Sequence, residues 1–191
     1  MSKIKWKGGT LLSPLPAVLV TCRDPETGRD NVLTIAWTGI LNSDPPRTYV
    51  SVRPERLSFE WIRKSGEFCI NLPTAGLARA VDLCGVKSGR DADKFRLAGL
   101  TPEPSSAVGC CSIAECPVTL ECRVFGETPL GSHTMFMADI LAVTVDERIV
   151  DEKGRMALEQ AGLLAYAHGT YFALGKQLGT FGYSVRKRKR S

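Results

Sequence analysis

The stretch that decides the fold runs from Asn31 to Pro73 and reads NVLTIAWTGILNSDPPRTYVSVRPERLSFEWIRKSGEFCINLP. Three strand-like runs, at 33–38, 49–53 and 68–72, alternate apolar residues with small or hydrogen-bonding ones. Because successive side chains of a strand point to opposite faces, each run has one apolar and one polar face. We expect the apolar faces to pack into the core.

The polar faces of these runs have an unusual composition. They carry Thr34, Ala36, Thr38, Ser51 and Asn71 instead of the Lys and Glu of a typical solvated face. Alternation by itself is equally typical of an antiparallel sheet whose second face lies in water. Small polar side chains, however, favour the close approach of a flat polar ligand. Two interpretations follow: a solvated sheet face, or a ligand-binding wall built from all three strands.

A helix is predicted over 58–64, between the second and third runs. Ser58 is suited to the N-cap position. The free N–H groups and the positive dipole end of such a helix, with Arg53 and Arg56 beside them, would form a phosphate site. The alternative is an ordinary capped helix with solvated arginines.

The rest of the chain adds strands before and after two helical regions. Apolar runs at 17–21, 116–126 and 133–146 predict strands, Thr74 is expected to cap a helix ending near Cys84, and 86–95 reads as an exposed loop or short helix. Strands and helices do not alternate as they do in a parallel sheet. The pattern therefore predicts a mainly β protein, a small antiparallel barrel with a few inserted helices.

Length and charge favour one neutral domain with a basic end. The 191 residues are 43% hydrophobic, enough for one well-filled core. The formal net charge is +5, and RKRKR at 186–190 carries five positive charges, so the remainder is neutral. We expect a domain at 1–185 and a flexible basic tail at 186–191, although a nuclear address or an RNA contact would share this pattern. A general nucleic-acid surface is not indicated.

The sequence lacks the signals of a membrane or secreted protein and of several common chemistries. It has no apolar run of about 18 residues and no signal-peptide h-region, so we expect a cytoplasmic protein with no membrane span. The motifs GxGxxG, GxxxxGK[ST] and GxSxG are missing. Seven cysteines without a CxxC pair predict free thiols and no metal site. With only two histidines, an enzyme of this sequence would depend on a bound cofactor.

Six segments together carry a resemblance to a known family. They are NVLTIAWTG (31–39), DPPRTYVSV (44–52), EFCINLP (67–73), CGVKSGRDADKF (84–95), GSHTMFMADIL (131–141) and YFALGKQLGTFGYSVRK (171–187). In this order and spacing, over roughly 15–186, the chain resembles the flavin reductase-like proteins of the FMN-binding split-barrel superfamily, and especially the flavoredoxin branch. Each segment alone is a weak signal.

The resemblance implies a Greek-key split barrel that works as a homodimer and holds FMN noncovalently near the subunit interface. Residues carried over by position are Thr34, Ala36, Trp37 and Thr38 along the isoalloxazine and ribityl chain; Ser51, Val52, Arg53 and Ser58 at the ribityl and phosphate end; Asn71 and Leu72 at the third strand's edge; Lys94 as a flavin contact; and Tyr171 at the outer rim.

The implied activity is that of an NAD(P)H-dependent flavin reductase. Hydride would pass from NAD(P)H to FMN, and electrons would go on to a flavin, ferric or protein acceptor. In related reductases a Gly-Asp-His motif approaches the nicotinamide side, and the matching residues here are Gly131, Ser132 and His133, which makes His133 a candidate contact. The alternatives are an FMN-binding electron carrier that does not oxidise NAD(P)H itself, and a non-flavin barrel that binds haem or nucleic acid.

Overall fold

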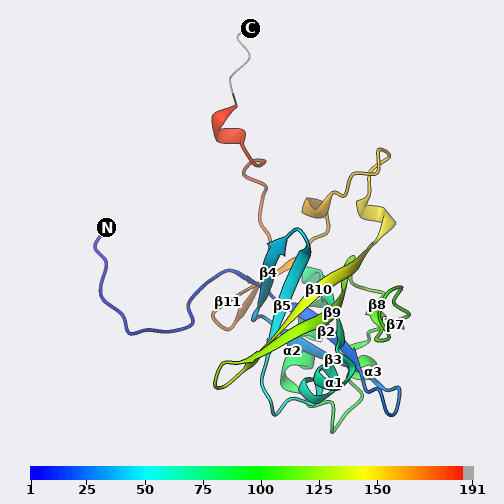
Figure 1. Ribbon diagram of the computed structural model, residues 1–191. Coiled ribbons are helices and arrows are strands. Elements are labelled where there is room, and N and C mark those ends of the chain that lie inside the picture. Colours follow the sequence, from blue (N-terminus) through cyan, green and yellow to red (C-terminus); the bar gives the residue numbers. More distant parts are fainter. Residues whose placement is uncertain (187–191) are drawn as a thin grey trace.

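The computed structural model describes residues 1–186 and is dominated by a seven-stranded antiparallel sheet (Figure 1). The spatial strand order is β3-β2-β6-β9-β10-β5-β4. The strands are β2 (Val18–Arg23), β3 (Asp30–Ile35), β4 (Thr38–Ser43), β5 (Pro46–Val52), β6 (Glu67–Leu72), β9 (Val118–Pro129) and β10 (Thr134–Val145). The two long strands correspond to the apolar runs predicted near 116–126 and 133–146.

The two edges of this sheet belong to one bent stretch of chain. Strand β3 pairs with β2 and strand β4 pairs with β5, yet only Ala36 and Trp37 separate β3 from β4. At the bend, the Ser51 N–H donates to the Trp37 carbonyl at 2.9 Å. The sheet is thereby closed into a barrel, and the prediction of a mainly β antiparallel split barrel is confirmed.

Strand β2 lies between two hydrophobic cores. Val18, Val20 and Cys22 point into the barrel, where they meet side chains such as Val50 and Phe68. The alternate residue Leu19 faces outward into a second cluster, formed with the helices and the chain near 111–116. Because both faces are buried, β2 reads in the sequence as a continuous apolar run instead of an alternating one.

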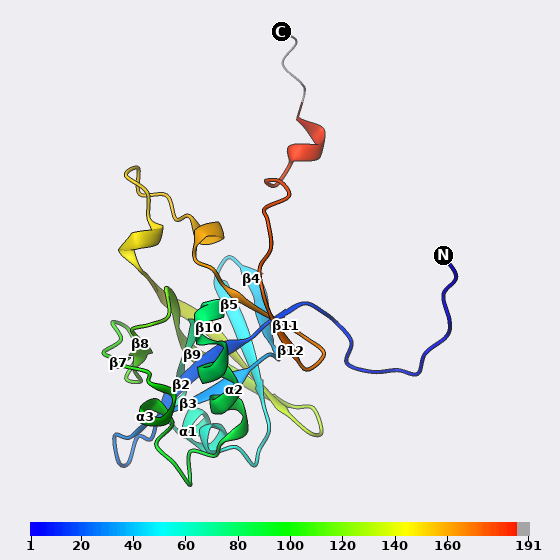
Figure 2. The same cartoon turned by 180° about the vertical axis from the view of Figure 1, so that it is seen from behind.

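Within the described part of the chain, three α-helices cover the barrel: α1 (Leu57–Ser65), α2 (Ala78–Val86) and α3 (Lys94–Ala98) (Figures 1 and 2). Helix α1 contributes Trp61 and Ile62 to the barrel core, whereas α2 and α3 pack in the second core. Among residues 1–186, no helix is long and apolar enough to cross a membrane.

Two helix boundaries differ from the sequence-based expectation. Ser58 is not an N-cap: α1 starts at Leu57, and the buried Ser58 hydroxyl instead accepts a hydrogen bond from Asn31 Nδ2 at 2.8 Å. Thr74 precedes only a 3₁₀ turn, Ala75–Leu77, and makes no side-chain cap. Helix α2 does not stop before Gly85 but continues through it to Val86. The glycine packs against the Thr34 side chain, where a Cβ would lie only 3.3 Å from Thr34 Cβ.

Shorter elements complete the structure. A small sheet joins β1 (Leu15–Pro16), β11 (Leu164–Ala167) and β12 (Thr170–Ala173), and β7 (Pro102–Glu103) pairs with β8 (Ser112–Ile113). A 3₁₀ turn at Glu147–Ile149 follows β10, and a second one at Leu158–Gln160 precedes β11. A third, Tyr183–Val185, lies after β12. Residues 1–14 and 174–186 run away from the body as two extended arms (Figures 1 and 2). The basic tail predicted at 186–191 lies outside the described residues from 187 on.

The three strand runs of the 31–73 stretch do not form one common wall, which corrects the sequence interpretation. In the barrel β2 separates β3 from β6, and β9 and β10 separate β6 from β5. The polar face of β6 is covered by the chain at 105–113. There Glu121, fully buried on the neighbouring strand, accepts the Ser106 N–H at 2.9 Å. Small polar residues on a strand can therefore mark internal packing as well as a ligand.

Asn71 is the centre of this covered face. Its amide nitrogen donates to the Leu19 carbonyl at 3.0 Å and to Thr21 Oγ1 at 3.3 Å. Its amide oxygen accepts from the Ile113 N–H at 3.0 Å and from Thr119 Oγ1 at 2.7 Å. With 0% exposure and four partners, Asn71 joins three segments of the fold and has no free group for a ligand.

Replacing Asn71 with Ala is expected to lower the free energy of unfolding by about 3 kcal/mol, because several buried donors and acceptors lose their partner at once. Urea denaturation of both proteins measures the difference. The control is Asn42→Ala, which removes an exposed amide that makes one hydrogen bond to Pro45. Equal stability losses for the two variants would contradict the role given to Asn71.

Candidate functional site

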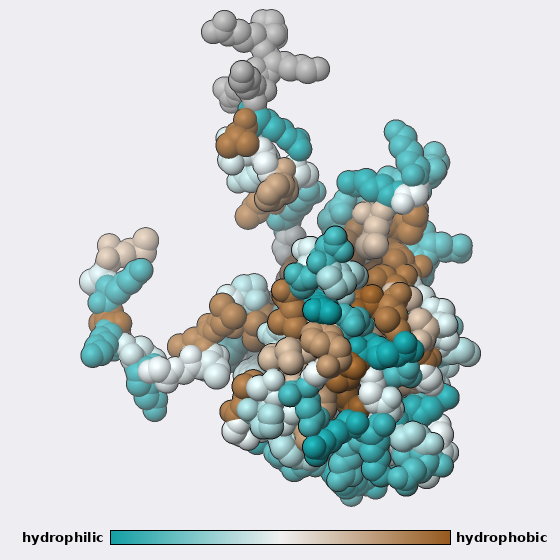
Figure 3. Space-filling view, in the orientation of Figure 1, coloured by the Kyte–Doolittle hydropathy of each residue, from teal (hydrophilic) through white to brown (hydrophobic). Residues whose placement is uncertain are grey.

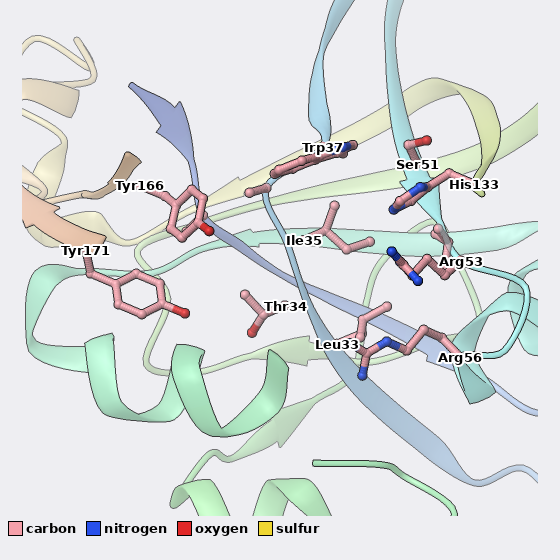
Figure 4. Close-up of a pocket in the computed structure, with 13 residues that line it drawn as sticks. Leu33, Thr34, Ile35, Trp37, Ser51, Arg53, Arg56, His133, Tyr166 and Tyr171 are labelled. Atoms are coloured by element: carbon pink, nitrogen blue, oxygen red, sulfur yellow. The ribbon is translucent and has the colours of Figure 1, made fainter. Parts of the chain in front are cut away.

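The bend between β3 and β4 opens a hollow with a volume of about 310 Å³ (Figure 4). It is the main hollow of the candidate site, because most of the predicted site residues line it. Because the chain turns at Ala36 and Trp37, residues on both faces of 33–37 reach the hollow. Its lining residues are Ala17, Leu33, Thr34, Ile35, Ala36, Trp37, Ser51, Val52, Arg53, Arg56, His133, Tyr166 and Tyr171. They come from the residue before β2, from β3, the bend, β5, the loop between β5 and α1, the β9–β10 turn and the β11–β12 hairpin.

One end of the hollow is basic. Arg53 and Arg56 lie together there, immediately before α1, whose N-terminus carries the positive end of the helix dipole (Figure 4). The only carboxylate paired with Arg53 in the described chain is the exposed Glu55, at 3.1 Å, and exposed pairs of this kind contribute little. Arg56 makes no ion pair within residues 1–186. Both guanidinium groups are therefore available to an anion.

A small recess adjoins this basic end and shares Leu33 and Arg56 with the main hollow. It is also lined by Ser58 and by Lys94, whose exposure is only 3%. Lys94 Nζ donates to the Cys84 carbonyl at 3.1 Å and has no carboxylate partner among the residues described. Burial lowers the pKa of Lys94 to about 8, with the nearby Arg56 acting in the same direction and the Cys84 and Cys22 thiols against it. A buried ammonium group without a counter-ion is costly, and a ligand anion would offset that cost.

The opposite end of the hollow is aromatic (Figure 4). The rings of Tyr166 and Tyr171 lie 5.6 Å apart in a tilted arrangement, and the Tyr171 hydroxyl donates to Asp82 Oδ1 at 3.3 Å. Trp37, which is 37% exposed, stacks with His133 at a centroid distance of 6.5 Å and an interplanar angle of 15°. Such flat side chains suit an aromatic ring system.

His133 lies between the two ends, in the turn before β10. Its Nδ1 is 2.9 Å from the Ser132 hydroxyl. Burial, and then the positive charge of Arg53, lower the pKa of His133 below its ordinary value, so the imidazole is neutral at pH 7. A neutral imidazole can donate or accept a hydrogen bond without adding charge at the hollow.

The structure brings most of the predicted site residues together. Those that line the main hollow are Thr34, Ala36, Trp37, Ser51, Val52, Arg53, His133 and Tyr171. Ser58 and Lys94 line the adjoining recess. Lys94 was assigned to the site by the family resemblance alone, because its neighbours in the sequence predict an exposed surface residue.

Three predicted residues do not reach either hollow. Thr38 is buried, and its hydroxyl donates to the Tyr49 carbonyl at 2.6 Å across the β4–β5 pair. Asn71 serves the covered face of β6. Leu72 packs between the barrel core and a third cluster around Val118 and Ile149. All three lie on the strands that the one-wall interpretation had placed beside the ligand.

The hollow also includes residues that were not predicted as ligand contacts. Leu33 and Ile35 were assigned to the core face, and the bend after them is what lets them serve both the core and the hollow. Ala17 and Tyr166 reach the site only because β2 and the β11–β12 hairpin fold against β3. No local sequence pattern distinguishes them.

Comparison with known proteins agrees with the split-barrel fold. Residues 11–175 match the family model of the flavin reductase like domain. The chain belongs to the flavin reductase-like family.

Two solved structures share the fold over nearly the whole chain. Flavoredoxin of Desulfovibrio vulgaris (Miyazaki F) superimposes with a TM-score of 0.89 at 30% identity, covering 97% of this chain and 100% of that one. Flavoredoxin from Methanosarcina acetivorans gives a TM-score of 0.87 at 25% identity and the same coverages. An uncharacterised protein of Pyrococcus abyssi is 33% identical over 141 residues, which is 74% of this chain and 80% of that protein.

Replacing Lys94 with Met is expected to stabilise the ligand-free protein below pH 8, because the substitution removes a buried unpaired charge at similar volume. The pKa of Lys94 is about 8 when folded and 10.5 in the unfolded chain, so the unfolded chain binds more protons between these values. Wild-type stability should therefore rise from pH 8 to 10.5, and the advantage of the variant should shrink.

Denaturant titrations at pH 7, 8.5 and 10 measure this convergence. The exposed Lys153→Met variant is the control and should follow the wild type at every pH. A constant difference between Lys94→Met and the wild type would contradict the buried-charge interpretation.

Proposed function

We propose that this chain is an FMN-binding oxidoreductase. The observation that carries the proposal is the polarity of the hollow, which matches a ligand with a phosphate at one end and a flat ring system at the other. The buried Lys94 has no anionic partner in the described chain. Burying an unpaired ammonium group costs free energy, and a bound phosphate would offset that cost. Membership of the flavin reductase-like family supports the same ligand.

The residues present fit FMN along its length. Arg53, Arg56 and Lys94 would hold the phosphate, with the α1 N-terminus adding its dipole. In the middle, the Ser51 hydroxyl makes no hydrogen bond within residues 1–186 and would contact the ribityl chain. The Thr34 hydroxyl donates to the Val81 carbonyl and can still accept a hydrogen bond.

When bound, FMN would supply the redox chemistry, because it exchanges a hydride with a nicotinamide and passes electrons onward. The protein's part is to bind and orient the ring against Trp37 and Tyr166 and to exclude water. Neutral His133 stands at the rim of the hollow, where it would contact the nicotinamide of NAD(P)H without adding positive charge. The expected onward acceptor is a flavin, a ferric complex or a redox protein.

A second candidate is an FMN-binding electron carrier that does not react with NAD(P)H itself. The similarity to two flavoredoxins over the whole chain favours it. So does the partner of His133, which is the Ser132 hydroxyl instead of a carboxylate that would strengthen the imidazole as a base.

Two measurements test these proposals in order. Addition of FMN to the purified protein should give a bound flavin spectrum, and protein that takes up no FMN would contradict both candidates. Rapid mixing of the FMN-loaded protein with NADH and with NADPH should then bleach the flavin absorption band. If neither nucleotide does so, the reductase proposal fails and the carrier remains.

Replacing Arg53 or Lys94 with Ala is expected to weaken FMN binding by about 1.5–3 kcal/mol each, the scale of a hydrogen bond to a charged group. Isothermal titration with FMN measures the affinities. The control is Arg63→Ala, which removes an exposed arginine from the far end of the same helix. Affinities equal to that of the control would remove the tested residue from the phosphate site.

We also propose that the protein is a homodimer. The outer face of β4, β9 and β10 exposes Ile40, Phe125, Leu141 and Val143, and apolar surface runs over this side of the barrel (Figure 3). The two arms expose further large apolar residues, among them Trp6 and Phe181, that find no place in the chain's own core. Contiguous apolar surface of this kind is typical of a subunit interface, and a second copy would cover it.

Replacing Leu141 with Glu is expected to shift the protein from dimer to monomer, because a carboxylate would be buried without a partner. Sedimentation equilibrium measures the mass. Leu97→Glu, on exposed surface of α3, serves as the control. A Leu141→Glu variant that stays dimeric would place the interface elsewhere.

A further inference from the structure

Two cysteines face each other on the covered side of β6. Cys69 lies within that strand, and Cys110 lies in the segment 104–111, which covers it. Their Sγ atoms are 3.6 Å apart, and the two residues are 0% and 2% exposed. All seven cysteines belong to the described residues, and no other two sulfur atoms lie within hydrogen-bonding distance. The function proposed above makes no use of this pair.

The surroundings of Cys69 favour its thiolate, which is the nucleophilic form of a cysteine. The Ser105 hydroxyl lies 3.3 Å from Cys69 Sγ, on which the Cys110 thiol also acts. The hydrogen bond with Cys110 lowers the pKa of Cys69 below its ordinary value and outweighs burial, and the Ser105 hydroxyl acts in the same direction. The charge of Glu121 opposes them. The same hydrogen bond raises the pKa of Cys110, which keeps its proton.

The other cysteines lack such support for a thiolate. Burial raises the pKa of all five of them: Cys22, Cys84, Cys111, Cys116 and Cys122. A buried thiol with a raised pKa is inert toward oxidants. Cys69 is therefore the cysteine that the fold prepares for reaction, and Cys110 is the thiol placed to complete it.

An irregular segment separates this pair from solvent. Residues 104–111 form no helix or strand, and Ser106 and Gly109 are exposed. The Ser106 N–H donates to the buried Glu121 at 2.9 Å. The Gly109 N–H donates to Glu67 Oε2 at 2.7 Å. A segment held by a few such hydrogen bonds opens at a lower free energy than the sheet beneath it, so a small oxidant can reach the two sulfur atoms.

We propose that Cys69 and Cys110 are a redox-active pair that a small hydroperoxide, such as hydrogen peroxide, converts into a disulfide. The Cys69 thiolate attacks one peroxide oxygen, the O–O bond breaks, and hydroxide leaves and takes up a proton to become water. Cys69 is then a sulfenic acid. The Cys110 thiol attacks the Cys69 sulfur, which forms the S–S bond and releases a second water. The two thiols lose two electrons, and one peroxide is reduced to two waters.

The location of Cys110 allows this bond to close. The two sulfur atoms must approach from 3.6 Å to the bond length of about 2.0 Å. Cys110 lies in irregular chain, which can move toward β6 more easily than a paired strand can. The disulfide would join residues 41 positions apart and fasten the segment 104–111 onto the sheet. A cross-link over such a length restricts the unfolded chain and so stabilises the fold.

The test treats reduced, full-length protein with hydrogen peroxide and then counts free thiols in denaturant. The wild type should fall from seven thiols to five, and dithiothreitol should restore all seven. Cys69→Ser and Cys110→Ser, which begin with six, should each keep six. The control is Cys116→Ser, which alters a buried cysteine outside the pair and should fall from six to four.

Mass spectrometry of digested, oxidised wild type should find Cys69 joined to Cys110. This measurement does not depend on the folding of any variant. Wild-type protein that keeps seven thiols, or in which Cys69 is joined to a different cysteine or becomes only a sulfinic acid, would overturn the proposal. Loss of two thiols from Cys69→Ser or Cys110→Ser would overturn it as well.

Thermal unfolding tests whether the bond fastens the segment. Oxidation is expected to raise the midpoint of the wild type by at least about 5 °C, because the cross-link restricts the unfolded chain. Dithiothreitol should reverse the rise, and Cys110→Ser should show none. Oxidised wild type that contains the linkage but unfolds at the midpoint of the reduced protein would overturn the fastening of 104–111.

Discussion

The hydrogen bond from the Ser51 N–H to the Trp37 carbonyl is the contact on which the rest of the structure depends. It joins β5 to the chain just after β3, so that one bent segment supplies both edges of a seven-stranded sheet. Closing the sheet into a barrel encloses the barrel core. The chain has to bend sharply where the sheet closes, so it cannot be a regular strand at that point. The main hollow lies at this bend. The same irregular segment therefore closes the barrel and forms the candidate site.

The basic end of the hollow shows how a site is maintained at a cost in stability. Lys94 is buried on a short helix whose N-cap is Asp93, which accepts the Arg96 N–H at 3.1 Å. That cap directs the start of α3 toward the recess, and the Cys84 carbonyl at the end of α2 receives the ammonium group. The two helices thus hold in place a charge that the fold alone would not favour. Strain or unpaired charge of this kind is expected where a protein is organised for a ligand and not for its own stability.

Much of the fold could be predicted from residue patterns, because alternation and turn residues act locally. The existence and approximate bounds of strands β2, β3, β9 and β10 follow from such patterns. Strand neighbours could not be predicted, because the order β3-β2-β6-β9-β10-β5-β4 depends on contacts between distant segments. Asn71 and Thr38 show the result: a small polar residue on a strand serves internal hydrogen bonds as readily as a ligand. Lys94 shows the converse, since its surroundings in the sequence describe a surface loop and only the family resemblance indicated a site.

Strand β2 is the strand that the two hydrophobic cores share. Both of its faces are buried, and both of its edges are paired, with β3 on one side and β6 on the other. No local fluctuation of a loop or an arm uncovers its amides. Exchange of these backbone hydrogens with solvent deuterium therefore requires opening of the whole barrel, and their exchange rates report the global stability of the fold directly.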